Sequence, residues 1–533
     1  MFLVSSAAAG TAIWHAACRS ERSSPNPAAK APADFELDEV SLTDLAVGLR
    51  SGKWTSSKLV ELYLGRIEAV DHGGPRLGAV LTVNPDAMAL ARRLDQEREG
   101  SHIRGRLHGI PILIKDNIQT SDRMSTTAGS LALADWRPPQ DSFVAARLRA
   151  AGALILGKTN LAEWAGFRSL HGTNGWSACG GQTRNPYALD RNPSGSSSGS
   201  GAGTAASLCG AAIGTETDGS VTSPASINGI VGMKPTVGLV SRSGIVPISA
   251  NQDTAGPMAR TVRDLAILLS AMTGVDPQDP ATDGSHGKVA SDYTRFLDAR
   301  GLRGARLGIP RKFFESNAPL DRFLSGCVDA LKKAGGEVID PADLPSHGQL
   351  DDPEMDLQSY EFKDGINRYL SRLPATSPVR SLKELIAFNE KNRAREMPFF
   401  DQELMIQSEA KGPLSEAGYR KTRAACLLLS RARGIDAVIA KHKLDALVTL
   451  TSGPAWLTDY VNGDYDVGGC FTPPAAAGYP HITVPAGFYR GLPIGLSFFG
   501  TAWSEPNLIK FAYAWEQQMN ARRKPGFLAS ASG

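Results

Sequence analysis

The stretch from Asn192 to Gly203, NPSGSSSGSGAG, contains five serines and four glycines in twelve positions. Such a composition is typical of a flexible linker, but clustered hydroxyls can also serve catalysis. A second serine turn follows in GTETDGSVTSP, where Ser220 stands after Thr-Asp-Gly. The successive N–H groups of such a turn can stabilise an oxyanion. Ser220 is therefore a candidate nucleophile, and a turn whose hydroxyls only cap the backbone is the structural alternative.

A serine hydroxyl is a weak nucleophile and needs a base to activate it. Lys115 ends the apolar run IPILIK. Burial there would lower the pKa of its ammonium group, so that the neutral amine could accept a proton near neutral pH. A relay from Ser220 through Ser196 to Lys115 would supply the base. The alternative is structural, because a lysine here can extend its ammonium group to the surface or pair with Asp116.

Strand and helix patterns alternate around these residues. LHGIPILIKDNI is a short apolar run bounded by Gly, Pro and Asp, which is typical of a buried strand. DSFVAARLRAAGALILGKT continues as a helix, a glycine turn and a second strand, which favours an α/β sheet. Strand patterns return in LDALVTLTSG and ITVPAGFYRGLPIGLSFFG. The sequence predicts one large α/β domain over 35–525, with a helical insertion at roughly 315–445.

The composition narrows the classes of function. The 533 residues are 42% hydrophobic and 21% charged with a net charge of +3, which is typical of a globular protein with a large core. No basic run with interleaved aromatic residues indicates nucleic-acid binding. The nine histidines are scattered and the six cysteines form no C-x-x-C pair, so we expect no metal site and no cofactor.

The first 34 residues differ from the rest of the chain. MFLVSSAAAGTAIWHAAC is too short to span a membrane as a mature helix and is similar to the hydrophobic part of a secretory signal whose basic region would lie upstream. HAAC weakly matches a lipoprotein cleavage box with Cys18 as the lipidated residue. The polar, proline-rich segment that follows is expected to be disordered. We therefore expect an exported protein, periplasmic or anchored by lipid, with a cytoplasmic protein as the alternative.

The block GSSSGSGAGTAASLCGAAIGTETDGSVTSP, which contains both serine turns, resembles the signature of the amidase signature family. Ser196 and Ser220 stand 24 positions apart, which matches the spacing of the family's bridging serine and nucleophile. The upstream GIPILIKDNI and the downstream DTAGPMARTVRD and ITVPAGFYRGLPIGLSFFG resemble further family motifs in the same order. The resemblance spans roughly residues 38–520.

The resemblance implies the family's fold, a large twisted mixed β-sheet covered by helices on both sides, and an amide hydrolase that forms an acyl-enzyme. It implies Ser220 as the nucleophile, Ser196 as the bridging serine and Lys115 as the base. It also implies that Ser197 supports the relay and that the bond between Gly195 and Ser196 is cis. The backbone N–H groups implied for the oxyanion hole are those of Thr217, Asp218 and Gly219, with that of Ser220.

Two departures from the usual family pattern favour a subgroup. Asp218 stands where the family usually has glycine, and Thr222 stands where it usually has arginine. Together with NPYALDR and NQDTAGPMAR, they make the chain most similar to bacterial peptide amidases, which release ammonia from C-terminally amidated peptides. The resemblance therefore implies a short peptide amide or another small amide as substrate, and no obligate protein partner.

Other interpretations stay open. GSSSG also fits the G-x-S-x-G pattern of α/β-hydrolases, with Ser197 as nucleophile and Asp466 and His481 in suitable chain order, although no strong apolar strand precedes it. Within the family, the alternatives are an aryl acylamidase and a component of a glutamine-dependent amidotransferase. A binding protein on an inactive amidase scaffold is the non-enzymatic alternative, and the presence of all three catalytic positions disfavours it.

Overall fold

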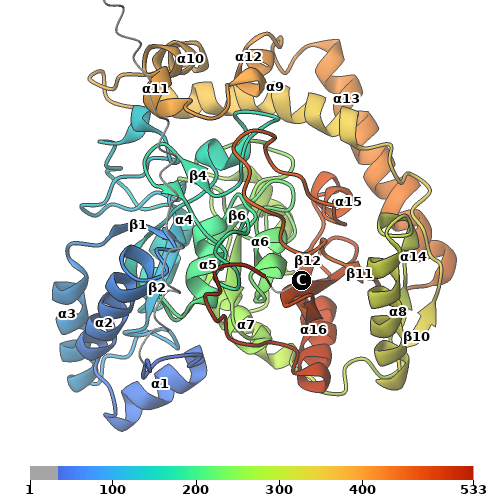
Figure 1. The fold of residues 1–533 in the computed structure, drawn as a ribbon, viewed down its shortest axis with the longest axis horizontal. Helices are drawn as coiled ribbons and strands as arrows, with labels where there is room; N and C mark the ends of the chain where they lie inside the picture. Colours follow the sequence, from blue (N-terminus) through green and yellow to red (C-terminus); the bar gives the residue numbers. More distant parts are fainter. Residues whose placement is uncertain (1–33, 532–533) are drawn as a thin grey trace, which may run out of the picture.

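The computed structural model describes residues 34–531. The signal-like segment with Cys18 lies outside these residues, so export and lipidation stay predictions. Within residues 34–531, no helix is long and apolar enough to cross a membrane. The described chain forms an eleven-stranded mixed sheet flanked by helices (Figure 1), which confirms the predicted α/β fold with one large sheet.

The sheet has the strand order β1-β3-β2-β6-β8-β7-β12-β13-β11-β9-β10. Its strands are β1 (Val80–Val83), β2 (Pro111–Lys115), β3 (Leu154–Thr159), β6 (Ala212–Glu216), β7 (Val231–Lys234), β8 (Thr254–Ala259), β9 (Arg306–Gly308), β10 (Glu337–Ile339), β11 (Ala446–Leu450), β12 (His481–Tyr489) and β13 (Leu492–Phe499). A separate two-stranded ribbon pairs β4 (Trp176–Ser177) with β5 (Gly181–Gln182).

Strand β2 is buried along its whole length, as its apolar run predicts. It pairs in parallel with β3 on one side and β6 on the other. Parallel strands covered on both faces are made of nearly continuous apolar residues, which is what PILIK supplies. The carboxyl ends of parallel strands meet at one edge of a sheet. Lys115 at the end of β2 therefore lies beside Thr215 and Glu216 at the end of β6.

The Gly/Ser stretch is a buried helix start and not a linker. Helix α5 (Ser198–Ala205) is buried at every residue and packs on the central strands. A Cβ at Gly199 would lie 2.2 Å from the Ala79 carbonyl oxygen, and one at Gly214 in β6 would lie 2.6 Å from the Ser197 hydroxyl. Only glycine permits this approach of helix, strand and serine turn.

The remaining α-helices cover the sheet or extend from it. They are α1 (Leu42–Ser51), α2 (Ser56–Arg66), α3 (Ala87–Glu99), α4 (Phe143–Ala150), α6 (Thr222–Ile227), α7 (Val262–Met272), α8 (Ala318–Lys333), α9 (Asp351–Leu370), α10 (Leu382–Lys391), α11 (Arg393–Glu396), α12 (Glu403–Glu409), α13 (Ala417–Leu427), α14 (Asp436–His442), α15 (Thr472–Ala476) and α16 (Glu505–Met519).

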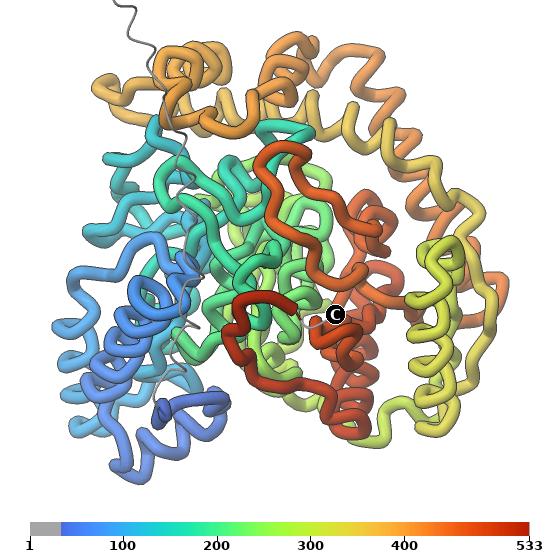
Figure 2. The backbone as a smooth tube through the Cα atoms, viewed as in Figure 1, coloured from blue at the N-terminus to red at the C-terminus, as the bar shows by residue number. Residues whose placement is uncertain are grey.

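Helices α9 to α13 form an arch across the top of the molecule in Figures 1 and 2. The arch packs through Phe362 and Ile366 of α9 against Trp164 and Phe167 of the core, in a second hydrophobic cluster. The structure also places strand β10 within the stretch expected to be helical, where it pairs in parallel with β9. Three residues are too short a run for an alternating pattern to stand out from the helices on either side.

Arg168 joins this arch to the core. Its guanidinium donates hydrogen bonds to the Glu163 carboxylate at 2.5 Å and to the Glu396 carbonyl at 2.6 Å, and it stacks on Phe400 at 4.2 Å. The side chains of Arg168 and Glu163 are each 1% exposed. Burial raises the pKa of Glu163, and Arg168 is the main group that opposes the rise.

We expect Arg168→Met to lower the free energy of unfolding by about 3 to 5 kcal/mol, because it leaves buried carboxyl groups without their cation. Urea unfolding followed by circular dichroism measures the loss. The matched control is Arg368→Met, which removes an arginine that is 64% exposed and paired with Asp364. That change should cost less than about 1 kcal/mol. Equal losses in the two variants would contradict a special role for the buried arginine.

Candidate active site

Lys115 is buried at the centre of a polar cluster. Its Nζ donates to the Ser196 hydroxyl at 2.7 Å, to the Thr215 hydroxyl at 3.0 Å and to the Thr215 carbonyl at 3.3 Å. Burial lowers the pKa of Lys115 to about 7, and the carboxylates of Asp253 and Glu216 oppose the change. A lysine with this pKa is partly neutral at physiological pH and can accept a proton from the hydroxyl it contacts.

The two structural alternatives for Lys115 are wrong. Lys115 is 0% exposed, so its ammonium group does not reach the surface. Asp116 accepts hydrogen bonds from the amide and hydroxyl of Thr127 and lies 3.8 Å from the ammonium group of Lys158. Asp116, the residue after Lys115, therefore pairs with Lys158 and not with Lys115.

Ser196 and Ser197 directly precede the buried helix α5, and Ser197 is its N-cap residue. The peptide bond between Gly195 and Ser196 is cis, as the family resemblance implies. The Ser197 hydroxyl donates to the Thr215 carbonyl at 3.1 Å and accepts from the Thr215 amide at 3.2 Å. The Ser197 amide donates to the carbonyl of Ser220 at 3.1 Å. Ser197 thus joins the first serine turn both to β6 and to the second serine turn.

Ser220 stands just before helix α6 and is 9% exposed. Its hydroxyl forms no hydrogen bond with the described protein residues, while the hydroxyl of Ser196 is held by Lys115. The structure therefore brings Lys115, Ser196, Ser197 and Ser220 together. A hydrogen bond joins Lys115 to Ser196, and none joins the hydroxyls of Ser196 and Ser220 within residues 34–531, so the relay stays a prediction.

The turn that carries Ser220 presents unused backbone donors. In residues 34–531 the amide groups of Asp218, Gly219 and Ser220 donate to no protein acceptor. Gly219 has φ +71°, and a Cβ there would lie 2.9 Å from the ring of Phe471, so the position requires glycine. Free N–H groups in a fixed turn are suited to hold an oxyanion.

Side chains on both sides fix this turn. The Glu216 carboxylate accepts from the amides of Val221 and Thr222, each at 2.8 Å. The Thr217 hydroxyl donates to Asp253 at 2.6 Å. The motifs alone did not indicate the contacts of Thr215, Glu216 and Asp253. The available signal for Thr215 and Glu216 was their place directly before the serine turn, and Asp253 begins the motif DTAGPMARTVRD.

The α/β-hydrolase alternative is not supported by the geometry. His481 is fully buried, its Nε2 is 2.5 Å from the Ser497 hydroxyl, and burial lowers its pKa to about 3. Asp466 accepts from the amide of Gly468, and the Ser197 hydroxyl is used by the backbone of Thr215. None of these hydrogen bonds links Ser197, Asp466 and His481 to one another.

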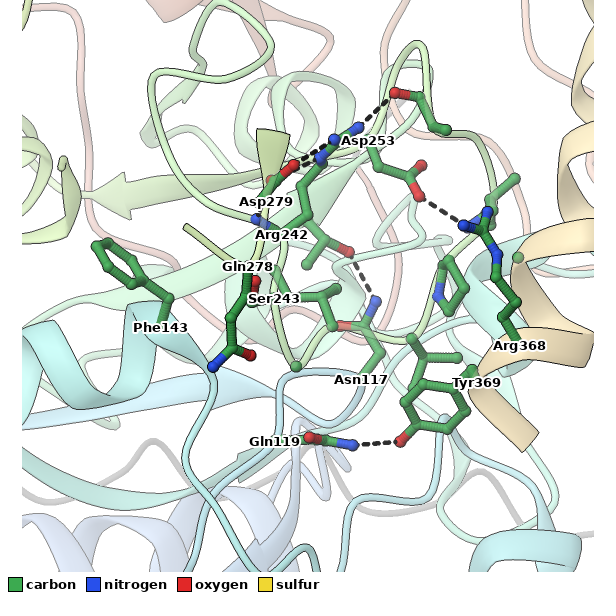
Figure 3. Close-up of a pocket in the computed structure, with 18 of the residues that line it drawn as sticks. Asn117, Gln119, Phe143, Arg242, Ser243, Asp253, Gln278, Asp279, Arg368 and Tyr369 are labelled. Atoms are coloured by element: carbon green, nitrogen blue, oxygen red, sulfur yellow. Dashed lines mark hydrogen bonds and ion pairs between the residues drawn. The ribbon is translucent and has the colours of Figure 1, made fainter. Parts of the chain in front are cut away.

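A cavity of about 660 Å³ lies beside the site (Figure 3). It reaches Thr215 and Thr217 but not Lys115, Ser196 or Ser220. About half of its lining residues have polar side chains, and these come from several elements. Those labelled in Figure 3 include Asn117, Gln119, Arg242, Ser243, Asp253, Gln278, Asp279, Arg368 and Tyr369.

Comparison with known proteins identifies the family. The sequence profile of the Amidase family matches residues 58–509. The chain belongs to the Amidase family. It is 42% identical to a probable amidase of Arabidopsis thaliana, over 93% of each chain. It is 34% identical to a component of the glutamyl-tRNA(Gln) amidotransferase of Roseiflexus sp., over 90% of this chain and 96% of that one.

Solved structures of a peptide amidase are also similar to this amidase. The peptide amidase of Stenotrophomonas maltophilia is 48% identical with a TM-score of 0.89, and the alignment covers 93% of this chain and 100% of that one. The structure of the peptide amidase PAM with the competitive inhibitor chymostatin has the same identity and TM-score, over 92% and 100%. The predicted fold and family are thereby confirmed, and the chain is an amide hydrolase.

Proposed function

We propose that this amidase converts the C-terminal carboxamide of short peptides to the free acid and ammonia, using Ser220, Ser196 and Lys115. The observation that carries the proposal is the buried Lys115 amine, 2.7 Å from the Ser196 hydroxyl and beside the Ser220 turn. The substrate class is supported by 48% identity to a peptide amidase that binds the inhibitor chymostatin.

In the proposed first half-reaction, neutral Lys115 takes the proton of Ser196 as Ser196 takes that of Ser220. The Ser220 oxygen attacks the carboxamide carbon and forms a tetrahedral oxyanion. Amides of Asp218, Gly219 and Ser220, with that of Thr217, donate to this oxyanion. The relay returns the proton to the amide nitrogen, the C–N bond breaks and ammonia leaves an ester on Ser220.

In the second half-reaction, a water molecule enters after the ammonia has left and attacks the ester on Ser220. The relay removes a proton from the water as its oxygen attacks the ester carbonyl. The same N–H groups hold the second oxyanion, and its collapse breaks the ester bond. The proton passes back to Ser220, which leaves the free peptide acid and the original enzyme.

The test is ammonia release from a matched panel. We expect release from a dipeptide amide and none from the same dipeptide as free acid, which has no terminal carboxamide. We expect little release from glutamine, because its carboxamide is on a side chain and not at the C-terminus of a peptide. Aniline release from an aryl acetanilide is followed in parallel. Turnover of the anilide alone would contradict the substrate class. Glutamine turnover that depends on added partner proteins would favour the amidotransferase alternative, which the Roseiflexus relative motivates.

A further inference from the structure

The side chain of Asp218 lies between two segments that are far from it in sequence. Its Oδ2 accepts from the hydroxyl of Thr472, the first residue of α15, at 2.8 Å. Its Oδ1 is buried and accepts from no donor in residues 34–531. The Asp218 carboxyl is also in contact with the carboxyl of Glu354, in the first turn of α9.

Glu354 is 5% exposed and is held in place from its other side. The Gln252 side chain donates to its Oε1 and reaches the Thr217 carbonyl at 3.5 Å. Two buried carboxyl groups in contact cannot both be ionised, because like charges repel strongly where water is excluded. A proton between them removes the repulsion and forms the hydrogen bond that joins Asp218 to Glu354.

We infer that Asp218 and Glu354 are positioning residues that share a proton, and that this proton fixes the Ser220 turn against helix α9. The inference rests on the proposed role of Ser220. A shared proton also limits the negative charge next to the amide of Asp218, which is proposed to donate to the oxyanion. A second full charge there would repel the oxyanion that the turn has to stabilise.

The groups around the pair favour the shared proton. Charged neighbours are Glu216 of β6 and Asp351 of α9, which oppose ionisation, and Lys234 of β7, which favours it. The neighbouring thiols of Cys426 and Cys470 have pKa values raised to about 12 by burial and stay neutral. Burial is the largest influence and raises the pKa of both carboxyl groups.

The raised pKa values of the two carboxyl groups determine how the stability of the folded protein changes with pH. The folded protein binds the shared proton more tightly than the unfolded chain does. The contribution of the shared proton to stability is therefore present at low pH and is lost as the pH rises through the folded-state pKa of Glu354, which burial and the Asp218 carboxylate raise well above its usual range. Above that folded-state pKa the two carboxylates repel, the turn loosens from α9, and turnover falls.

The experiment compares Glu354→Gln, Glu354→Ala and Asp218→Asn with the wild type, using a dipeptide amide across the neutral and alkaline range. We expect Glu354→Ala to lower kcat by about 100-fold with a smaller change in KM, because the turn is misplaced. Glu354→Gln should restore most of kcat, since its amide donates to Asp218 permanently. It should also lose the alkaline decline, because that amide does not ionise.

Asp356→Ala is the matched control, since Asp356 is on the same helix, is 39% exposed and pairs with Lys411 at the surface. Its kcat and pH profile should equal those of the wild type. A wild-type profile in Glu354→Gln and Asp218→Asn would overturn the inference, even if Glu354→Ala does not fold. Full turnover in Ser220→Ala would instead overturn the proposed function. If Ser220→Ala is inactive and Glu354→Gln keeps the wild-type pH profile, the inference about the carboxyl pair is overturned and the proposed function is not.

Discussion

Ser220→Ala is expected to lower kcat by about 10⁵- to 10⁶-fold while KM changes little, as for other serine nucleophiles that act with a base. The hydroxyl is the only group removed. The turn is held by Glu216, Thr217 and the Ser197 amide, none of which the change touches. Ammonia release from a dipeptide amide measures the loss, and a covalent acyl-enzyme seen by mass spectrometry after rapid acid quench should disappear with it.

Ser197→Ala is the matched control for that change. Its hydroxyl is equally close to the cluster but is used by both backbone groups of Thr215. Its loss should lower kcat by about 10-fold, through displacement of the turn alone. An inactive Ser197→Ala beside an active Ser220→Ala would move the nucleophile to Ser197. His481→Gln should keep the acyl-enzyme, because His481 contacts Ser497 and none of the serines of the site.

The residues of the candidate site could be found in the sequence because each belongs to a short, contiguous pattern. In PILIK every residue before the final lysine is apolar. The local pattern alone therefore predicts a buried strand that ends in a lysine. The same holds for the two serine turns, whose glycines mark sharp backbone changes. From its composition alone, the first serine turn would be interpreted as a linker. The burial of α5 shows instead that the small residues there allow close packing.

Contacts across the sheet and from the arch could not be predicted in this way. The apolar run shows that β2 is a buried strand, but it does not show that β6 (Ala212–Glu216) is a strand beside it or that Thr215 faces Lys115. Periodicity shows α9 as a helix, but not that Glu354 meets Asp218. These pairings depend on strand order and on the path of the arch, which are set by packing over the whole domain.

Three buried lysines lie near the same edge of the sheet, and their partners distinguish them. Lys158 donates to the Ile118 carbonyl at 2.6 Å and has the Asp116 carboxylate at 3.8 Å, which favours its charged form. Lys234 has the carboxylates of Glu216 and Glu505 near it. The pKa values of these two lysines are lowered to about 8. Lys115 also has carboxylates near it, those of Asp253 and Glu216, but it is the lysine that donates to Ser196, and its pKa is lowered furthest, to about 7.

Lys115, the proposed base, is therefore the lysine whose loss should be most visible in the pH profile of activity. In the wild type, kcat/KM should rise as the pH passes through about 7, because the fraction of neutral Lys115 rises there. Lys115→Met should lose about 100- to 10,000-fold in kcat and that rise with it. Lys115→Arg keeps a cation but stays charged at every accessible pH, so it should be equally inactive. Lys158→Met should weaken the fold but leave the rise of kcat/KM with pH in place. Near-normal turnover by Lys115→Arg would show that the charge of Lys115, not its basicity, supports the reaction.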